Sequence, residues 1–231
     1  VTGLTAEDIA RTWHDSIPAA SESPEVEGVV AGGRQGRMEL GPALSPDGRR
    51  VMFLSERDRL SVDLFLADTT KDRRTKKIVS TAADPHFDSL QYLDSSGAWD
   101  RTGRRFAKAA VRSGAAVLVL VDVAQGNHEE LPLPGVSQAF NPSWSPDGSR
   151  IVVSGLKGGL ADLFIYTVAT KTLRQLTADP FADVQPAWSP DGSTIAFATD
   201  RFSSSVDQLR FGPLRVGLLD LESGSIRPLD P

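Results

Sequence analysis

The side chains that most often carry chemistry are few in this chain and widely spaced. Its 231 residues include no cysteine, which excludes disulfides, thiolate metal sites and cysteine nucleophiles. The histidines His14, His86 and His128 do not pair at metal-ligand spacing, and no His-Glu-x-x-His motif occurs. No Gly-x-Ser-x-Gly motif supplies the nucleophile turn of a serine hydrolase. The sequence therefore predicts no catalytic residue, no metal site and no cofactor.

Two related acidic segments are the best candidates for a functional site: Asp84-Pro85-His86-Phe87-Asp88 and Asp179-Pro180-Phe181-Ala182-Asp183. Carboxylates gathered on a concave rim attract cations because the rim focuses the electric field. Such a rim could hold a cation or the basic end of a peptide. The candidate interaction residues are Asp84, His86, Asp88, Asp179, Phe181 and Asp183.

Two alternatives compete with this interpretation of the acidic segments. In the first, the Asp-Pro turn and the second aspartate only cap backbone amides, which is a structural role. In the second, Asp88 and Asp183 act as acid and base of a hydrolase or lyase. The segments lack the regular aspartate spacing of a dedicated calcium loop.

Both acidic segments lie between copies of a repeated unit that contains Ser-Pro-Asp-Gly. The turn glycines of the copies are Gly48, Gly103, Gly148 and Gly192, which gives steps of 55, 45 and 44 residues. A period near 45 residues with strand-like segments is typical of a β-propeller. In the second copy Asp-Arg-Thr replaces Ser-Pro-Asp, so a looser turn is expected there.

The residue types within one copy explain how the unit folds. Proline presets φ, aspartate bonds neighbouring amides and glycine adopts positive φ, so Ser-Pro-Asp-Gly predicts a hairpin turn. Alternating and short apolar segments follow it, which predicts four antiparallel strands in each copy. By register, Trp99, Trp144 and Trp188 are expected to pack in the blade core, and Arg57 and Arg201 to form salt bridges at the ends of second strands.

The copies resemble the TolB-like family of β-propeller repeats, whose blade reads Pro-x-Trp-Ser-Pro-Asp-Gly, then Ile-Ala-Phe, Asp-Leu-Phe and Leu-Thr. The copy at 142–177 matches this pattern almost throughout, and the resemblance covers about residues 41–230. It implies that the connections carrying the acidic segments line the mouth of a central channel, and that the protein is periplasmic or secreted. A narrower similarity, to large secreted bacterial proteins in which a propeller follows a metallopeptidase-like domain, rests on the stretch from Trp13-His14-Asp15-Ser16 through 84–88.

The predicted fold is an all-β propeller of about four blades, each a four-stranded antiparallel sheet, preceded by a short N-terminal helix. The expected blades are residues 38–80, 86–134, 138–177 and 183–230, after a helix in 1–20 and a linker in 21–37. TolB-like propellers usually have about six blades. The ring is thus small and closed, completed by residues outside this chain, or completed by another protein.

The N-terminal segment has a different period from the blades. Thr5 is a candidate N-cap, and Ile9, Trp13 and Ile17 recur on one helical face. This face either packs on the propeller or a preceding domain, or docks a partner.

Composition narrows the class of partner. The net charge is −5 without a concentrated basic face, so nucleic acid is not expected as a partner. No apolar run is long enough for a membrane helix. A start at Val1 is expected for a processed or excised product. The leading hypothesis is a non-catalytic scaffold that binds protein partners in the cell envelope as a subunit of an assembly; the alternative is an accessory substrate-presenting domain of a secreted peptidase.

Overall fold

A computed structural model describes residues 39–58, 61–69, 75–80, 87–90 and 97–229, without the side chains of residues 57–58 and 87–90. The predicted N-terminal helix in 1–20, with Ile9, Trp13 and Ile17, lies outside the described residues, as does the linker in 21–37. In the described part, no helix has the length and apolar character that a membrane crossing requires.

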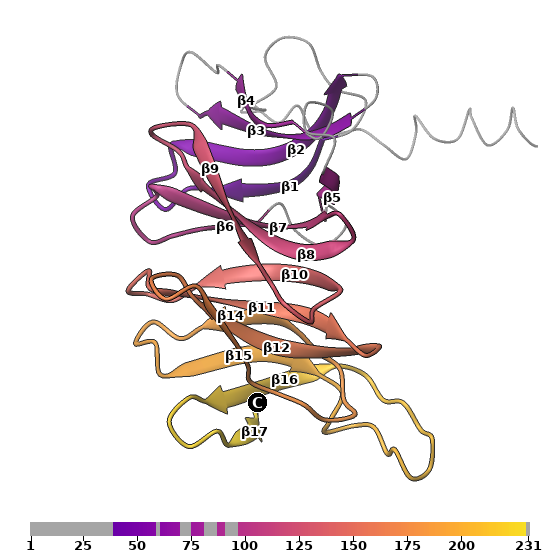
Figure 1. Ribbon diagram of the computed structural model, residues 1–231. Helices are drawn as coiled ribbons and strands as arrows, with labels where there is room; N and C mark the ends of the chain where they lie inside the picture. The colour runs from indigo at the N-terminus through magenta and orange to yellow at the C-terminus, as the bar shows by residue number, and fades with distance from the viewer. Residues whose placement is uncertain (1–38, 59–60, 70–74, 81–86, 91–96, 230–231) are drawn as a thin grey trace, which may run out of the picture.

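The described chain is all β, and its strands form four antiparallel sheets that follow one another along the sequence. Figure 1 shows the sheets stacked in chain order, from indigo to yellow. Blade 1 comprises β1 (Glu39–Leu44), β2 (Arg50–Asp58), β3 (Ser61–Asp68) and β4 (Thr75–Val79). Blade 2 comprises β5 (Phe87–Leu90), β6 (Ala98–Trp99), β7 (Arg105–Arg112), β8 (Ala115–Asp122) and β9 (Asn127–Pro132). Blade 3 comprises β10 (Gln138–Trp144), β11 (Arg150–Lys157), β12 (Leu160–Thr167) and β13 (Thr172–Gln175). Blade 4 comprises β14 (Asp183–Trp188), β15 (Thr194–Thr199), β16 (Arg215–Asp220) and β17 (Ile226–Pro228).

The prediction of four-stranded antiparallel blades is confirmed for blades 1, 3 and 4, in which each strand pairs with its neighbour in sequence. Blade 2 has one strand more, because β5 and β6 both pair with β7. Its first strand is therefore split into two short segments.

The predicted hairpin turns connect the first and second strands of the blades. Gly48, Gly103, Gly148 and Gly192 have φ values between +66° and +75°, a region that residues with a Cβ rarely adopt. Each glycine amide donates to the carbonyl oxygen three residues earlier, over 2.9–3.0 Å. The Asp147 carboxylate accepts the amide two residues later at 3.1 Å. The turn residues therefore have the roles that the sequence pattern predicts.

The expectation of a looser turn in blade 2 was wrong. In blade 3 the Ser145 hydroxyl accepts the amide of Arg150 at 2.9 Å. Asp100 stands at the equivalent position in blade 2, and its carboxylate accepts the amides of Arg104 and Arg105 at 3.0 and 3.1 Å. Asp100, together with the Thr102 hydroxyl that donates to it and accepts the Arg104 amide at 3.3 Å, thus replaces the serine and the aspartate of the other turns.

Apolar side chains between consecutive sheets form the core. Between blades 2 and 3, for example, Leu118 and Leu131 pack with Trp144 and Tyr166, and all four are buried. The prediction that the tryptophans pack in the core is confirmed there.

Each blade tryptophan also bonds the preceding blade, which the sequence did not predict. The indole Nε1 donates to the backbone carbonyl next to the matching position of that blade: Trp99 to Ala43 at 2.9 Å, Trp144 to Ala98 at 3.1 Å and Trp188 to Ser143 at 3.0 Å. An arginine of the preceding blade lies over each indole, with guanidinium carbon to ring centroid distances of 5.3 Å for Arg50 on Trp99, 4.4 Å for Arg105 on Trp144 and 4.8 Å for Arg150 on Trp188. The blade junctions therefore share one polar connection in addition to apolar packing.

Candidate functional site

The second acidic segment forms an ion-paired cluster around one arginine. It leads from the connection after β13 into the first residue of β14, while Arg201 is the second residue after β15. Arg201 Nη1 lies 2.9 Å from Asp179 Oδ2, and Arg201 Nη2 lies 2.6 Å from Asp183 Oδ2. The guanidinium therefore bridges the two ends of the segment. This confirms the predicted salt bridge for Arg201; the side chain of Arg57 lies outside the described residues.

Burial makes this cluster a structural unit. The Asp183 side chain is fully buried and that of Arg201 is 12% exposed, whereas that of Asp179 is 32% exposed. The Arg201 guanidinium also lies over the rings of Phe181 and Phe197, at 5.6 and 5.8 Å from their centroids. Burial lowers the pKa of Arg201, but the bonds to Asp183 and Asp179 outweigh it and hold that pKa above its usual value. The arginine is therefore a permanent cation within the cluster.

Backbone capping, the structural alternative, is present for the first aspartate of the segment, whereas the second, Asp183, bonds Arg201. Asp179 Oδ1 accepts the amide of Phe181 at 3.1 Å. Asp200 Oδ1 accepts the amide of Ala182 at 2.9 Å, and Asp200 Oδ2 accepts the hydroxyl of Ser204 at 2.7 Å. These bonds fix the segment against the residues that follow β15.

The negative charges of the cluster also act on a further buried carboxylate, that of Asp162, the third residue of β12. Asp162 is 3% exposed and accepts bonds from Gln175 Nε2 at 3.0 Å and from the Thr177 hydroxyl at 3.3 Å. Burial raises the pKa of Asp162, the Thr177 bond opposes that rise, and the negative charges of Asp183 and Asp179 add to it. The end of blades 3 and 4 that carries the 179–183 segment is thus rich in negative charge.

Blade 1 has an equivalent buried aspartate, but a different residue type faces it. Asp63 is also fully buried there, and Lys77 Nζ lies 2.8 Å from its carboxylate. Lys77 pairs with Phe65 in the sheet register as Gln175 pairs with Phe164. Blade 3 therefore has a neutral amide where blade 1 has a cation.

A small pocket adjoins the cluster. It lies between the 179–183 segment and the residues after β15, and its lining includes Phe181, Asp200, Leu209 and Phe211. Its volume is about 80 Å³. A site for a drug-sized ligand has roughly 300–1,000 Å³, so this pocket suits one side chain and not a cofactor.

The other predicted site residues are described only in part. Asp84 and His86 lie outside the described residues, and Asp88 lies on β5 without a described side chain. The structure brings Asp179, Phe181 and Asp183 together around Arg201; the position of this cluster at a channel mouth stays a prediction. Among the residues with described side chains, no three histidine, aspartate or glutamate side chains meet in a way that could hold a metal ion.

Sequence reasoning missed Asp162, Asp200 and the pocket. For Asp162 a signal existed, because Asp-Leu-Phe recurs as residues 63–65 and 162–164 while the facing residue changes from lysine to glutamine. For the pocket there was none, because it depends on the conformation of residues 202–213, which have no counterpart in the other copies.

Comparison with known proteins places this geometry in a family context. The family model described as TolB beta propeller domain matches residues 88–207, about half of the chain. A curated relative, the Tol-Pal system protein TolB of Anaeromyxobacter dehalogenans (strain 2CP-C), is 39% identical over 89 residues, which cover 38% of this chain and 20% of that protein. The chain thus matches about one fifth of the length of this relative.

Solved structures share the fold at low sequence identity. TolB from Acinetobacter baumannii aligns with a TM-score of 0.63 and 19% identity, over 87% of this chain and 45% of that one. A puromycin-hydrolyzing peptidase of Mycobacterium tuberculosis aligns with a TM-score of 0.61 and 15% identity, over 87% of this chain and 30% of that one. Identities this low show a common fold and no more.

Proposed function

Because the chain belongs to the TolB beta propeller domain family, we propose that it is a non-catalytic β-propeller scaffold that binds protein partners. We place it in the bacterial cell envelope, periplasmic or secreted, as a subunit of a larger assembly. The name of the curated relatives, Tol-Pal system protein, supports a role within a protein system. Fold alone does not determine function, so the site must carry the rest of the argument.

The main support is the state of the carboxylates around Arg201. Asp179 and Asp183 are both ion-paired with the one guanidinium of Arg201, and Asp200 bonds an amide and a hydroxyl. Groups held in this way define a shaped and charged surface, which suits recognition more than proton transfer. The partly exposed side chains of Asp179 and Phe181 are the members of the cluster that a partner protein would contact.

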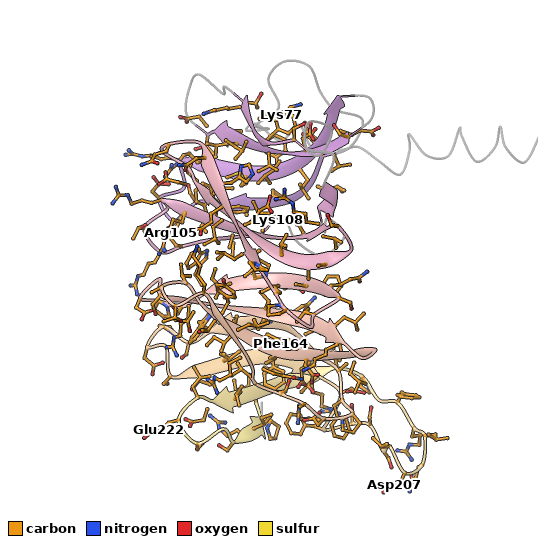
Figure 2. The ribbon with its side chains drawn as sticks, viewed as in Figure 1. Lys77, Arg105, Lys108, Phe164, Asp207 and Glu222 are labelled. Carbon is orange, nitrogen blue, oxygen red and sulfur yellow. The ribbon has the colours of Figure 1, made fainter. Side chains whose placement is uncertain are left out.

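Cross-linking in the source cells tests this function. A tagged chain is cross-linked before lysis and purified, and the products are identified by mass spectrometry. We expect a partner protein in stoichiometric amount, with a reduced yield for Asp179→Asn and Phe181→Ser and an unchanged yield for the control Glu222→Gln, since Glu222 is exposed in the turn between β16 and β17 and lies away from Asp207 in Figure 2. Recovery of the chain alone as a monomer would contradict the scaffold function.

A second candidate function is an accessory domain that presents substrate within a secreted peptidase. Its support is the fold likeness to the puromycin-hydrolyzing peptidase and to the tricorn protease, of which this chain covers 30% and 17%. An immunoblot of the source culture with an antibody against this chain separates the two functions. A much larger polypeptide that also contains a peptidase motif favours the second; a product without one favours the first.

A further inference from the structure

The connection between β15 and β16 distinguishes blade 4 from its neighbours. In blades 2 and 3 the second and third strands are joined by two-residue turns, Ser113-Gly114 and Gly158-Gly159. In blade 4, residues 200–214 separate the two strands, and we call them the blade 4 loop. Figure 2 shows this loop projecting from the stack of sheets, with Asp207 at its tip.

The blade 4 loop is held in one conformation by its own hydrogen bonds. Ser205 and Arg210 exchange two backbone bonds of 2.8 and 3.0 Å, which form a small hairpin. At its base the Ser204 hydroxyl donates to Asp200 and accepts the amide of Gly212 at 2.9 Å. A Cβ on Gly212 would come within 2.4 Å of the carbonyl oxygen of Ser203. These contacts therefore give the loop a defined conformation.

This loop exposes large apolar side chains. Four of the eight that are exposed in the described part of the chain lie in this loop, namely Val206, Leu209, Phe211 and Leu214. Leu209 is 79% exposed and Phe211 is 87% exposed, and Leu209 also has a φ of +50°, which is unfavourable for leucine. Contiguous exposed apolar side chains on a soluble protein commonly mark an interaction site. The loop therefore presents Leu209 and Phe211 to solvent, with Leu209 in a conformation that is unfavourable for its residue type.

The pocket beside the loop indicates the size of what it binds. Its volume is about 80 Å³, which is about the volume that three water molecules occupy in liquid water. One branched aliphatic side chain fits such a space. Phe181, Leu209 and Phe211, which all line the pocket, would contact that side chain.

The charged groups at this end of blades 3 and 4 indicate which type of ligand residue would lie next to the aliphatic side chain in the pocket. The carboxylates are those of Asp162, Asp179, Asp183, Asp200 and Asp207, against the guanidinium groups of Arg201, Arg210 and Arg215 and the ammonium group of Lys157. Five negative groups thus stand against four positive ones, and the position equivalent to Lys77 is occupied by Gln175, whose Oε1 accepts a bond from Lys157 Nζ at 2.9 Å. The surplus favours a lysine or arginine in the ligand and opposes an anionic lipid surface.

We propose that the blade 4 loop and the 179–183 segment together bind an extended segment of a partner protein. One aliphatic side chain of that segment enters the pocket between Phe181 and Phe211, and an adjacent lysine or arginine faces the surplus carboxylates. The proposal rests on the proposed scaffold function and names the surface and the partner chemistry.

Selection of random peptides tests the proposal. Phage that display random 12-residue peptides are selected on the full chain, and enriched peptides are synthesised for titration by fluorescence anisotropy. We expect an aliphatic residue next to lysine or arginine in the enriched peptides, and at least tenfold weaker binding to Leu209→Ser and to Phe211→Ser. Leu160→Ser is the matched control, because Leu160 is 45% exposed beside the corresponding turn of blade 3.

The outcomes separate this proposal from the scaffold function. Absence of enriched peptides, or equal binding to Phe211→Ser and to the unchanged chain, would overturn the binding surface, and a partner captured by cross-linking would still support the scaffold. Binding to phosphatidylcholine vesicles that is lost in Phe211→Ser, without any enriched peptide, would also overturn it in favour of a lipid contact. Unchanged urea unfolding midpoints of both serine variants show that weaker binding does not arise from unfolding.

Discussion

Trp144 Nε1 donates to the carbonyl oxygen of Ala98 in the preceding blade, over a distance of 3.1 Å. The same relationship recurs at the other two junctions, and the arginine over each indole adds a cation–π contact. Because the bond joins two blades, we expect it to stabilise the stack and not the single sheet.

Replacement of Trp144 by phenylalanine tests this junction. Trp144→Phe keeps an aromatic ring but removes the donor and weakens the contact with Arg105, so the free energy of unfolding should fall by about 1–2 kcal/mol. The control is Leu44→Phe, since Leu44 occupies the same position in blade 1 and is 61% exposed. Urea unfolding measures both variants. Equal stability of Trp144→Phe and the unchanged chain would show that the indole contributes by shape alone.

A second prediction concerns the buried ion pair of the cluster. Arg201→Met removes the cation and leaves the fully buried Asp183 without its partner, which should lower the free energy of unfolding by about 3–5 kcal/mol. Lys171→Met is the control, because the pair between Lys171 and Glu129 is largely exposed and its loss should cause no measurable change. If both variants unfold at the same urea concentration, Asp183 does not depend on Arg201.

The repeat made most of the fold predictable from sequence. Ser-Pro-Asp-Gly fixes a turn through local chemistry, so Gly148 and Asp147 behave as predicted wherever the motif is intact. The prediction for the turn at Asp100 was wrong because a carboxylate and a threonine hydroxyl can exchange the roles of the serine and the aspartate, which a residue-by-residue comparison does not reveal.

The site was predictable only where it repeats. Asp179 and Asp183 were identified from the doubled acidic segment, and Arg201 from its match with Arg57. The exposed Phe211 was not predicted, because the blade 4 loop occurs once and its conformation follows from bonds such as that from the Gly212 amide to Ser204. A single insertion carries no periodic signal from which its exposure can be inferred.

The turn aspartates give a third prediction, on acid stability. Hydrogen bonds from the Ser145 hydroxyl, and from the hydroxyl and amide of Ser149, lower the pKa of Asp147 from 3.8 to about 2. The native state then binds fewer protons than the unfolded chain, so this contribution to stability is complete above about pH 4 and is lost as the pH falls towards 2. Asp147→Asn should therefore be less stable than the unchanged chain at pH 5, with a smaller difference at pH 2.5.

Urea unfolding at the two pH values measures this effect. Ser145→Ala removes the strongest of the donors to Asp147 and should reproduce part of the loss at pH 5. A stability difference for Asp147→Asn that is equal at both pH values would mean that the carboxylate charge makes no contribution.

The fourth prediction exploits the difference between blades 1 and 3. Because burial and the charges of Asp183 and Asp179 raise the pKa of Asp162, the native carboxyl binds a proton more readily than the unfolded chain. The stability contributed by Asp162 therefore falls as the pH rises from 3.8 through its raised pKa, and its charged form destabilises the fold at pH 7. Gln175→Lys places a cation where blade 1 has Lys77, and should raise the free energy of unfolding at pH 7 by about 1–2 kcal/mol.

The pH dependence of Gln175→Lys separates charge pairing from other effects of the substitution. At pH 3 the carboxyl of Asp162 is protonated in the native state, so the gain should disappear there. Gln175→Met, which lacks both the amide donor and the cation, should be less stable than the unchanged chain at pH 7 because Asp162 loses a hydrogen bond. A gain for Gln175→Lys that persists at pH 3 would have to come from packing, and a loss at pH 7 would mean that the lysine does not reach the Asp162 carboxylate as Lys77 reaches that of Asp63.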